Sequence, residues 1–83
     1  MPEVHGISEQ KHILPYLEAR GLVRQYRKAK QFLLDGDTLR VCFKERNPKH
    51  SGAWYFRINK QFRAVGFFRD TGRLVIYDID NHQ

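Results

Sequence analysis

Residues 53–79, AWYFRINKQFRAVGFFRDTGRLVIYDI, decide the fold of this chain. Three runs rich in aromatic and β-branched residues, AWYFRI, FRAVGFFR and RLVIYDI, are separated only by the short polar segments NKQ and DTG. Such runs, bounded by turn-forming residues, are typical of β-strands joined by tight hairpins. The sequence therefore predicts three consecutive antiparallel strands in the last third of the chain.

Two helices are predicted before these strands. Ser8, followed by Glu9, resembles a helix N-cap, and Pro15 either kinks this first helix or lies in its first turn. Gly21 is expected to end it as a C-cap. A second helix is predicted from about residue 22 to residue 34, because apolar and basic residues there occupy opposite faces. The two helices would form a hairpin that covers one side of the sheet.

One more strand is predicted at residues 39–45, LRVCFKE, where apolar and polar residues alternate. The loop 46–52 follows it, and residues 1–7 are expected to be an arm. This order predicts an α+β fold: an N-terminal helical hairpin packed on a small, largely antiparallel four-stranded sheet. A chain of 83 residues forms one domain, residues 1–83, with a thin core. We therefore expect an open groove as its site.

The chain is strongly basic. It has 15 Lys and Arg against 9 Asp and Glu, a formal net charge of +6 and a pI near 9.8. A pI above 9 is typical of nucleic-acid-binding domains, although an acidic partner protein is the alternative. Cys42 is the only cysteine, which excludes a disulfide framework and a thiolate metal site. Without a signal-peptide pattern or a long apolar run, a soluble, cytoplasmic protein without membrane contact is expected.

Alternation along the strands assigns side chains to two faces of the sheet. Trp54, Phe56 and Ile58 are expected to face the helices, and Ile79 is placed with Val75 on the opposite face. That opposite face would also carry a mixed set of aromatic, basic and apolar side chains: Tyr55, Arg57, Asn59, Arg63, Val65, Phe67 and Tyr77. Val65, Phe67 and Tyr77 would form an apolar floor that binds a partner, unless the N-terminal arm or a second copy covers it.

Arg57 and Arg63 are the strongest candidates for chemistry. They are adjacent across the NKQ hairpin, so both guanidinium groups are expected to converge on one phosphate. The alternative is that they form ion pairs with nearby acidic residues: Asp78, Asp80 or Glu45. His82 is the candidate for proton transfer, because an imidazole titrates near neutral pH.

Further cations are expected to contact phosphate: Lys44, Lys49 and His50. Asp78 and Asp80 share a face, but two carboxylates without other ligands do not predict a metal site. No metal or cofactor is therefore predicted.

In these features the chain resembles the RelE/ParE superfamily of toxins from type II toxin–antitoxin systems, which includes the HigB and YoeB branches. The resemblance rests on the order of a helix hairpin and four strands, and on residues 54–83, WYFRINKQFRAVGFFRDTGRLVIYDIDNHQ. Within that stretch an aromatic and basic strand is followed by a turn, by a strand beginning Phe62-Arg63, and by a last strand with a polar, His-containing tail.

The resemblance implies a small toxin that is neutralised by a cognate antitoxin protein. RelE-like members are ribosome-dependent mRNA endonucleases that inhibit translation, whereas ParE-like members poison DNA gyrase. In the nucleases, basic residues on the second and third strands hold the scissile phosphate, and these match Arg57 and Arg63 here, with Lys44 or Lys49 as further candidates. His82 matches the residue that assists proton transfer.

We therefore expect an endoribonuclease that acts on mRNA without a cofactor, with Tyr55 or Tyr77 stacking on or orienting a base. Two alternatives stay open. One is a gyrase-directed inhibitor, and the other is a non-catalytic module that binds RNA or a partner protein.

Overall fold

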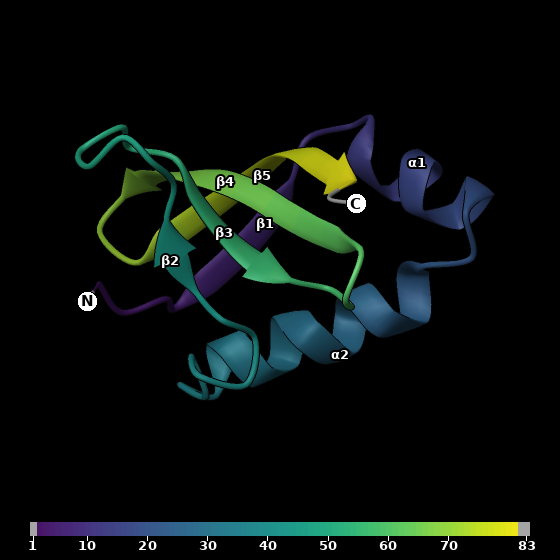
Figure 1. Cartoon of the computed structure of the whole chain (residues 1–83), viewed down its shortest axis with the longest axis horizontal. Helices are drawn as coiled ribbons and strands as arrows, with labels where there is room; N and C mark the ends of the chain where they lie inside the picture. Colours follow the sequence, from purple (N-terminus) through teal and green to yellow (C-terminus); the bar gives the residue numbers. More distant parts are fainter. Residues whose placement is uncertain (1, 82–83) are drawn as a thin grey trace.

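The computed structural model describes residues 2–81, which form two helices and a five-stranded sheet (Figure 1). In chain order the elements are β1 (Gly6–Glu9), α1 (Ile13–Ala19), α2 (Val23–Leu34), β2 (Lys44–Glu45), β3 (Trp54–Arg57), β4 (Phe62–Asp70) and β5 (Arg73–Asn81). The sheet order is β1-β5-β4-β3-β2, with β1 parallel to β5 and all other neighbours antiparallel. The predicted α+β class is confirmed, but the sheet is mixed and has five strands where four were predicted.

The N-terminal segment differs most from the prediction. Ser8 and Glu9 do not begin a helix; they lie in β1, the edge strand that residues 1–7 were expected not to form. Helix α1 begins at Ile13, so Pro15 occupies its first turn, where the missing N–H of proline costs nothing. Gly21 follows the helix with φ +67°, the left-handed conformation typical of a residue just past a helix end.

The strand predicted at residues 39–45 is also wrong for most of its length, because only Lys44 and Glu45 pair with β3. Residues before them form turns: the backbone N–H of Phe43 donates to the Thr38 carbonyl oxygen (3.0 Å), and Cys42 has φ +51°. Local turn hydrogen bonds therefore replace the ladder that alternation predicted. Val41 and Phe43 are still buried, whereas Leu39 is 89% exposed.

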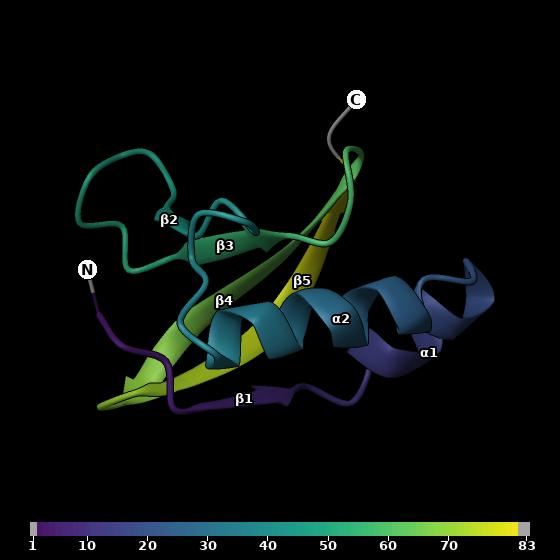
Figure 2. The ribbon, with the colours of Figure 1, turned by 90° about the horizontal axis from the view of Figure 1, so that it is seen from below.

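Both helices lie on one side of the sheet, as predicted (Figure 2). The core between the two layers takes buried apolar residues from both helices and from β3, β4 and β5, and the partly buried Ile7 of β1 packs against it. Phe56, Ala64, Leu74 and Ile76 are completely buried beneath α2 and α1. Phe56 stacks on the ring of Tyr26, with centroids 6.0 Å apart. None of the described helices is long and apolar enough to cross a membrane.

An irregularity in the β4–β5 hairpin overturns the assignment of Ile79. Val65 pairs with Asp78 but Gly66 pairs with Ile76, so Tyr77 is an extra, bulged residue. The bulge shifts the alternation by one position, and Ile79 therefore lies in the core, 7% exposed. Only glycine fits at position 66, because a Cβ there would lie 2.6 Å from the carbonyl oxygen of Val75.

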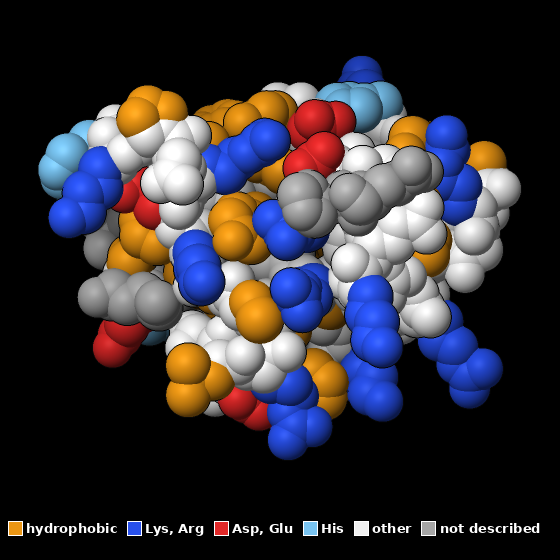
Figure 3. Space-filling view, in the orientation of Figure 1, with side chains coloured by type: hydrophobic (Ala, Val, Ile, Leu, Met, Phe, Trp, Pro, Cys, Tyr) orange, Lys and Arg blue, Asp and Glu red, His pale blue; other side chains and the backbone are white. Residues whose placement is uncertain are grey.

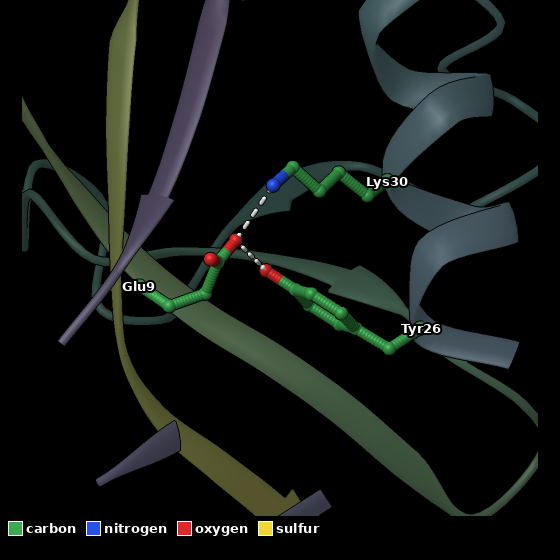
Figure 4. A network of polar contacts seen from close by, with 3 residues as sticks. All are labelled: Glu9, Tyr26 and Lys30. Atoms are coloured by element: carbon green, nitrogen blue, oxygen red, sulfur yellow. Dashed lines mark hydrogen bonds and ion pairs between the residues drawn. The ribbon is translucent and has the colours of Figure 1, made fainter. Parts of the chain in front are cut away.

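Hydrogen bonds, one of which is also an ion pair, connect β1 to α2 (Figure 4). The Tyr26 hydroxyl donates to Oε2 of Glu9 (2.6 Å), and Lys30 Nζ donates to the same oxygen (2.9 Å). Burial, and then the hydrogen bond and negative charge of Glu9, raise the pKa of Tyr26 far above its ordinary value, so the hydroxyl stays a donor. The network holds the edge strand against the helix layer.

Candidate nucleic-acid interface

The face of the sheet away from the helices carries the predicted mixture of side chains. Register places Tyr55 opposite Val65, Arg57 opposite Arg63, and Arg63 opposite Asp80, so these five side chains emerge on one face. On the side of the molecule seen in Figure 3, Lys and Arg side chains are widely spread, while acidic side chains form a few small groups. The described part of the N-terminal arm does not cover this face, since Val4 packs into the core.

A depression of about 380 Å³ lies on this face, and we call it the open-face pocket. It is lined by side chains from β2 to β5 and the loop after β2: Lys44, Glu45, Arg46, Asn47, Tyr55, Arg63, Val65 and Asp80. The sheet brings these residues together although they are up to 36 positions apart in the chain. Three cations and two carboxylates line the pocket, so its balance is basic.

Arg63 occupies the centre of this group. Its guanidinium carbon lies 4.8 Å from the centroid of the Tyr55 ring, a cation–π arrangement that fixes the side chain. Its Nε is buried and has no hydrogen-bond partner among residues 2–81. A buried donor without a partner carries a desolvation cost that an oxyanion would remove.

The predicted alternative of ion pairs at the arginines is not found in the described part of the chain. Asp80, which lies opposite Arg63 in register, instead pairs with Arg46, with Nη2 of Arg46 and Oδ2 of Asp80 3.6 Å apart. Within residues 2–81, no ion pair joins Arg57 or Arg63 to Asp78, Asp80 or Glu45. Arg46 and Asp80 were not predicted as site residues. Arg46 is the first residue of the loop that follows the predicted strand 39–45, and this position is the sequence signal that could have indicated it.

Arg57 and Arg63 do not converge on one pocket, although their backbones are opposite each other. Arg57 ends β3, and its backbone N–H donates to the carbonyl oxygen of Val41 (2.7 Å). The loop through Val41 therefore forms a wall beside β3, and Arg57 lines a second depression between this loop and α2. The expectation that both guanidinium groups contact one phosphate is thus not supported by the structure.

The other predicted contacts are dispersed. Lys44 lines the open-face pocket, but Lys49 and His50 lie exposed in the loop after β2 and do not line it. Tyr77 also lies outside the pocket: its ring packs against Phe67, with centroids 5.9 Å apart. His82 lies outside the described residues.

The predicted apolar floor is mostly covered. Val65 is only 1% exposed and offers almost no surface to a partner, whereas Phe67 is 38% exposed. Val65 lies on β4 opposite Tyr55 of β3 and Asp78 of β5, so neighbouring strands flank it on both sides. Among the described residues, no group of three His, Cys, Asp or Glu side chains is placed to hold a metal ion.

The chain matches no protein-family model, no curated protein and no solved structure. The interpretation of the site therefore rests on its own geometry and charge.

Proposed function

We propose that this protein is an endoribonuclease that cleaves mRNA as a toxin, with the open-face pocket as its site. The observation that carries the proposal is Arg63, whose buried Nε has no partner within residues 2–81 and whose guanidinium stacks on Tyr55. An arginine held in this way is preorganised for a phosphate. The adjacent tyrosine ring offers a surface on which an unpaired RNA base stacks.

The chemistry that fits these residues uses the RNA's own nucleophile. The 2′ oxygen bonds to the adjacent phosphorus while the bond from phosphorus to the 5′ oxygen breaks, which leaves a 2′,3′-cyclic phosphate and a 5′ hydroxyl. A base removes the proton of the 2′ hydroxyl, and an acid gives one to the leaving oxygen. Arg63 and Lys44 would stabilise the negative charge that develops on the phosphoryl oxygens. The acid–base role of His82 stays a prediction from the sequence.

Induced expression in growing cells tests the proposal, with primer extension of transcripts in the first minutes after induction. Three proteins are compared: the wild type, Arg63→Ala and Arg69→Ala. Arg69 is the matched control, because it is an exposed arginine of β4 that does not line the pocket. We expect cuts within translated codons for the wild type and for Arg69→Ala, and their loss for Arg63→Ala.

Cuts that persist at full strength in a folded Arg63→Ala variant would contradict the proposal. The same experiment separates the alternatives. Arrested growth with intact transcripts would indicate a gyrase-directed inhibitor, and normal growth with intact transcripts would indicate a non-catalytic binding module. The neutralising antitoxin stays a prediction from the family resemblance.

A further inference from the structure

The second depression, which we call the α2-side pocket, has a different character from the first. It lies between α2, the loop before β2 and the end of β3, and has a volume of about 170 Å³. It is lined by three cations, two amides and an apolar floor: Lys28, Arg40, Arg57, Gln25, Asn59, Ala29, Phe32, Val41 and Ile58. Within residues 2–81, no carboxylate lines this pocket.

The three cations line the pocket from α2, from the loop before β2 and from the end of β3. Arg40 lies over the Phe32 ring, with its guanidinium carbon 4.7 Å from the centroid, and Lys28 Nζ lies 6.0 Å from the same centroid. Arg40 pairs with Asp37 (2.9 Å), whereas Lys28 and Arg57 have no ion-pair partner among the residues that the structure describes. A concave wall of like charge over an apolar floor concentrates anions.

The rim of this pocket is held in place by hydrogen bonds. Asn59 Nδ2 donates to Oε1 of Gln25 (2.8 Å), which links the turn after β3 to α2. Asn59 Oδ1 accepts from the backbone N–H groups of Gln61 and Phe62, both at 2.8 Å. The amides therefore fix the shape of the pocket, and the cations supply its charge.

The size and position of the pocket define the ligand. The depression of about 170 Å³ is open to solvent and has room for a phosphate group beside its cations. Arg57 lies opposite Arg63 in register, with Cα atoms about 5 Å apart. The two pockets therefore flank the same end of β3, and one extended polyanion can reach both.

We propose that the α2-side pocket holds a backbone phosphate of the RNA strand whose scissile phosphate lies at Arg63. Lys28, Arg40 and Arg57 would contact this second phosphate and fix the register of the strand. The inference rests on the proposed function for the identity of the ligand as RNA, but it does not require that the chain cleaves that RNA.

The test measures how the affinity for RNA depends on salt. The probe is a 2′-O-methyl octanucleotide, which lacks the attacking hydroxyl and so stays intact, and whose length lies within the range bound by small single-strand domains. Lys28→Ala is compared with Arg27→Ala, an exposed neighbour on α2 with the same charge that does not line the pocket. We expect Lys28→Ala to reduce the slope of log K against log salt by about 0.7, the value for one phosphate contact to a single strand, and Arg27→Ala to leave it unchanged.

Equal slopes for Lys28→Ala and Arg27→Ala would overturn the inference, because only net charge would then matter. Arg57→Ala provides a second variant on a different element, and it should reproduce the change seen for Lys28→Ala. Absence of octanucleotide binding by the wild type would also overturn the inference. If transcripts stay intact in cells but the slopes change as expected, the proposed RNA cleavage is wrong, whereas the proposed phosphate binding in the α2-side pocket holds.

Discussion

The two cation-lined pockets lie on either side of the end of β3, yet they differ in charge. The open-face pocket combines three cations with Glu45 and Asp80, and its walls come from four strands. The α2-side pocket is smaller, has three cations and no carboxylate among its described lining residues, and takes its walls from α2, the loop before β2 and the end of β3. A fully basic pocket suits holding a phosphate, whereas a mixed pocket suits a site where charge and protons move.

This difference matters because binding and catalysis need different contacts. An interaction that is equally strong with bound RNA and with the transition state lowers KM but leaves kcat unchanged. The cations of the α2-side pocket are suited to that uniform binding. Arg63 is suited to the other task, because its Nε has no partner among residues 2–81 and because Asp80, which lies opposite it in register and lines the same pocket, opposes tight binding of the unreacted phosphate.

The largest effect is expected from a substitution in the core that disrupts both pockets together. Phe56 is completely buried under the part of β3 that both pockets share, and it stacks on Tyr26. Phe56→Ala is expected to lower the free energy of unfolding by about 3–5 kcal/mol, measured by urea denaturation, with loss of RNA binding at both sites. Phe56→Leu, which leaves a smaller cavity, should lose less. If Phe56→Ala has the same urea midpoint of unfolding as the wild type, Phe56 does not support the part of β3 that both pockets share.

The next effect separates the pockets. Arg63→Ala is expected to lower kcat for RNA cleavage by about 10²–10³-fold, since one donor to a developing oxyanion has that weight. Arg57→Ala is expected to raise KM more than it lowers kcat. Both constants come from initial rates over a range of substrate concentrations. If Arg57→Ala lowers kcat as strongly as Arg63→Ala, both arginines serve the transition state, and the distinction between the pockets is wrong.

The open-face pocket lies in the part of the fold that local sequence patterns predicted well. Strands β3, β4 and β5 lie close to their predicted bounds, because a two-residue alternation and tight turns specify hairpins through neighbouring residues. Helix α2 begins one residue later than predicted. The shared face of Tyr55, Arg57 and Arg63 followed from the same alternation.

The α2-side pocket depends on contacts that no local pattern contains. It joins Gln25 to Asn59 and lays the loop through Val41 along the edge of β3, where the alternation in residues 39–45 had indicated a strand. The parallel pairing of β1 with β5 was missed for the same reason, since its partners are more than 60 residues apart. One bulged residue, Tyr77, was enough to move Ile79 from the open face to the core.

An intermediate effect tests whether stability and binding are separate. Tyr26→Phe removes the hydrogen bond to Glu9 and is expected to lower the free energy of unfolding by about 1–3 kcal/mol, because the acceptor is a partly buried carboxylate. RNA affinity should not change, since the hydroxyl faces β1 and lines neither pocket. Tyr16→Phe, which removes the hydroxyl of a tyrosine on α1, is the matched control and should change stability less. A loss of RNA affinity in a folded Tyr26→Phe variant would show that the α2-side pocket depends on this network.

The smallest expected effect comes from a substitution that makes the charge of the open-face pocket more like that of the α2-side pocket. Asp80→Asn removes a carboxylate beside Arg63 and frees Arg46 from its ion pair. The variant is expected to bind the octanucleotide about two- to fivefold more tightly at low salt, the range of a partly exposed charge interaction, and the gain should shrink as salt rises. Asp70→Asn, at an exposed position of β4 that lines neither of these two pockets, controls for net charge and should give a smaller gain.

Tighter binding without an increase in kcat would sharpen the distinction, because it would show that the carboxylate limits how strongly the unreacted phosphate is held. Weaker binding would instead show that Asp80 is needed to position Arg46 and Arg63, and that the acidic residues of the open-face pocket serve its structure.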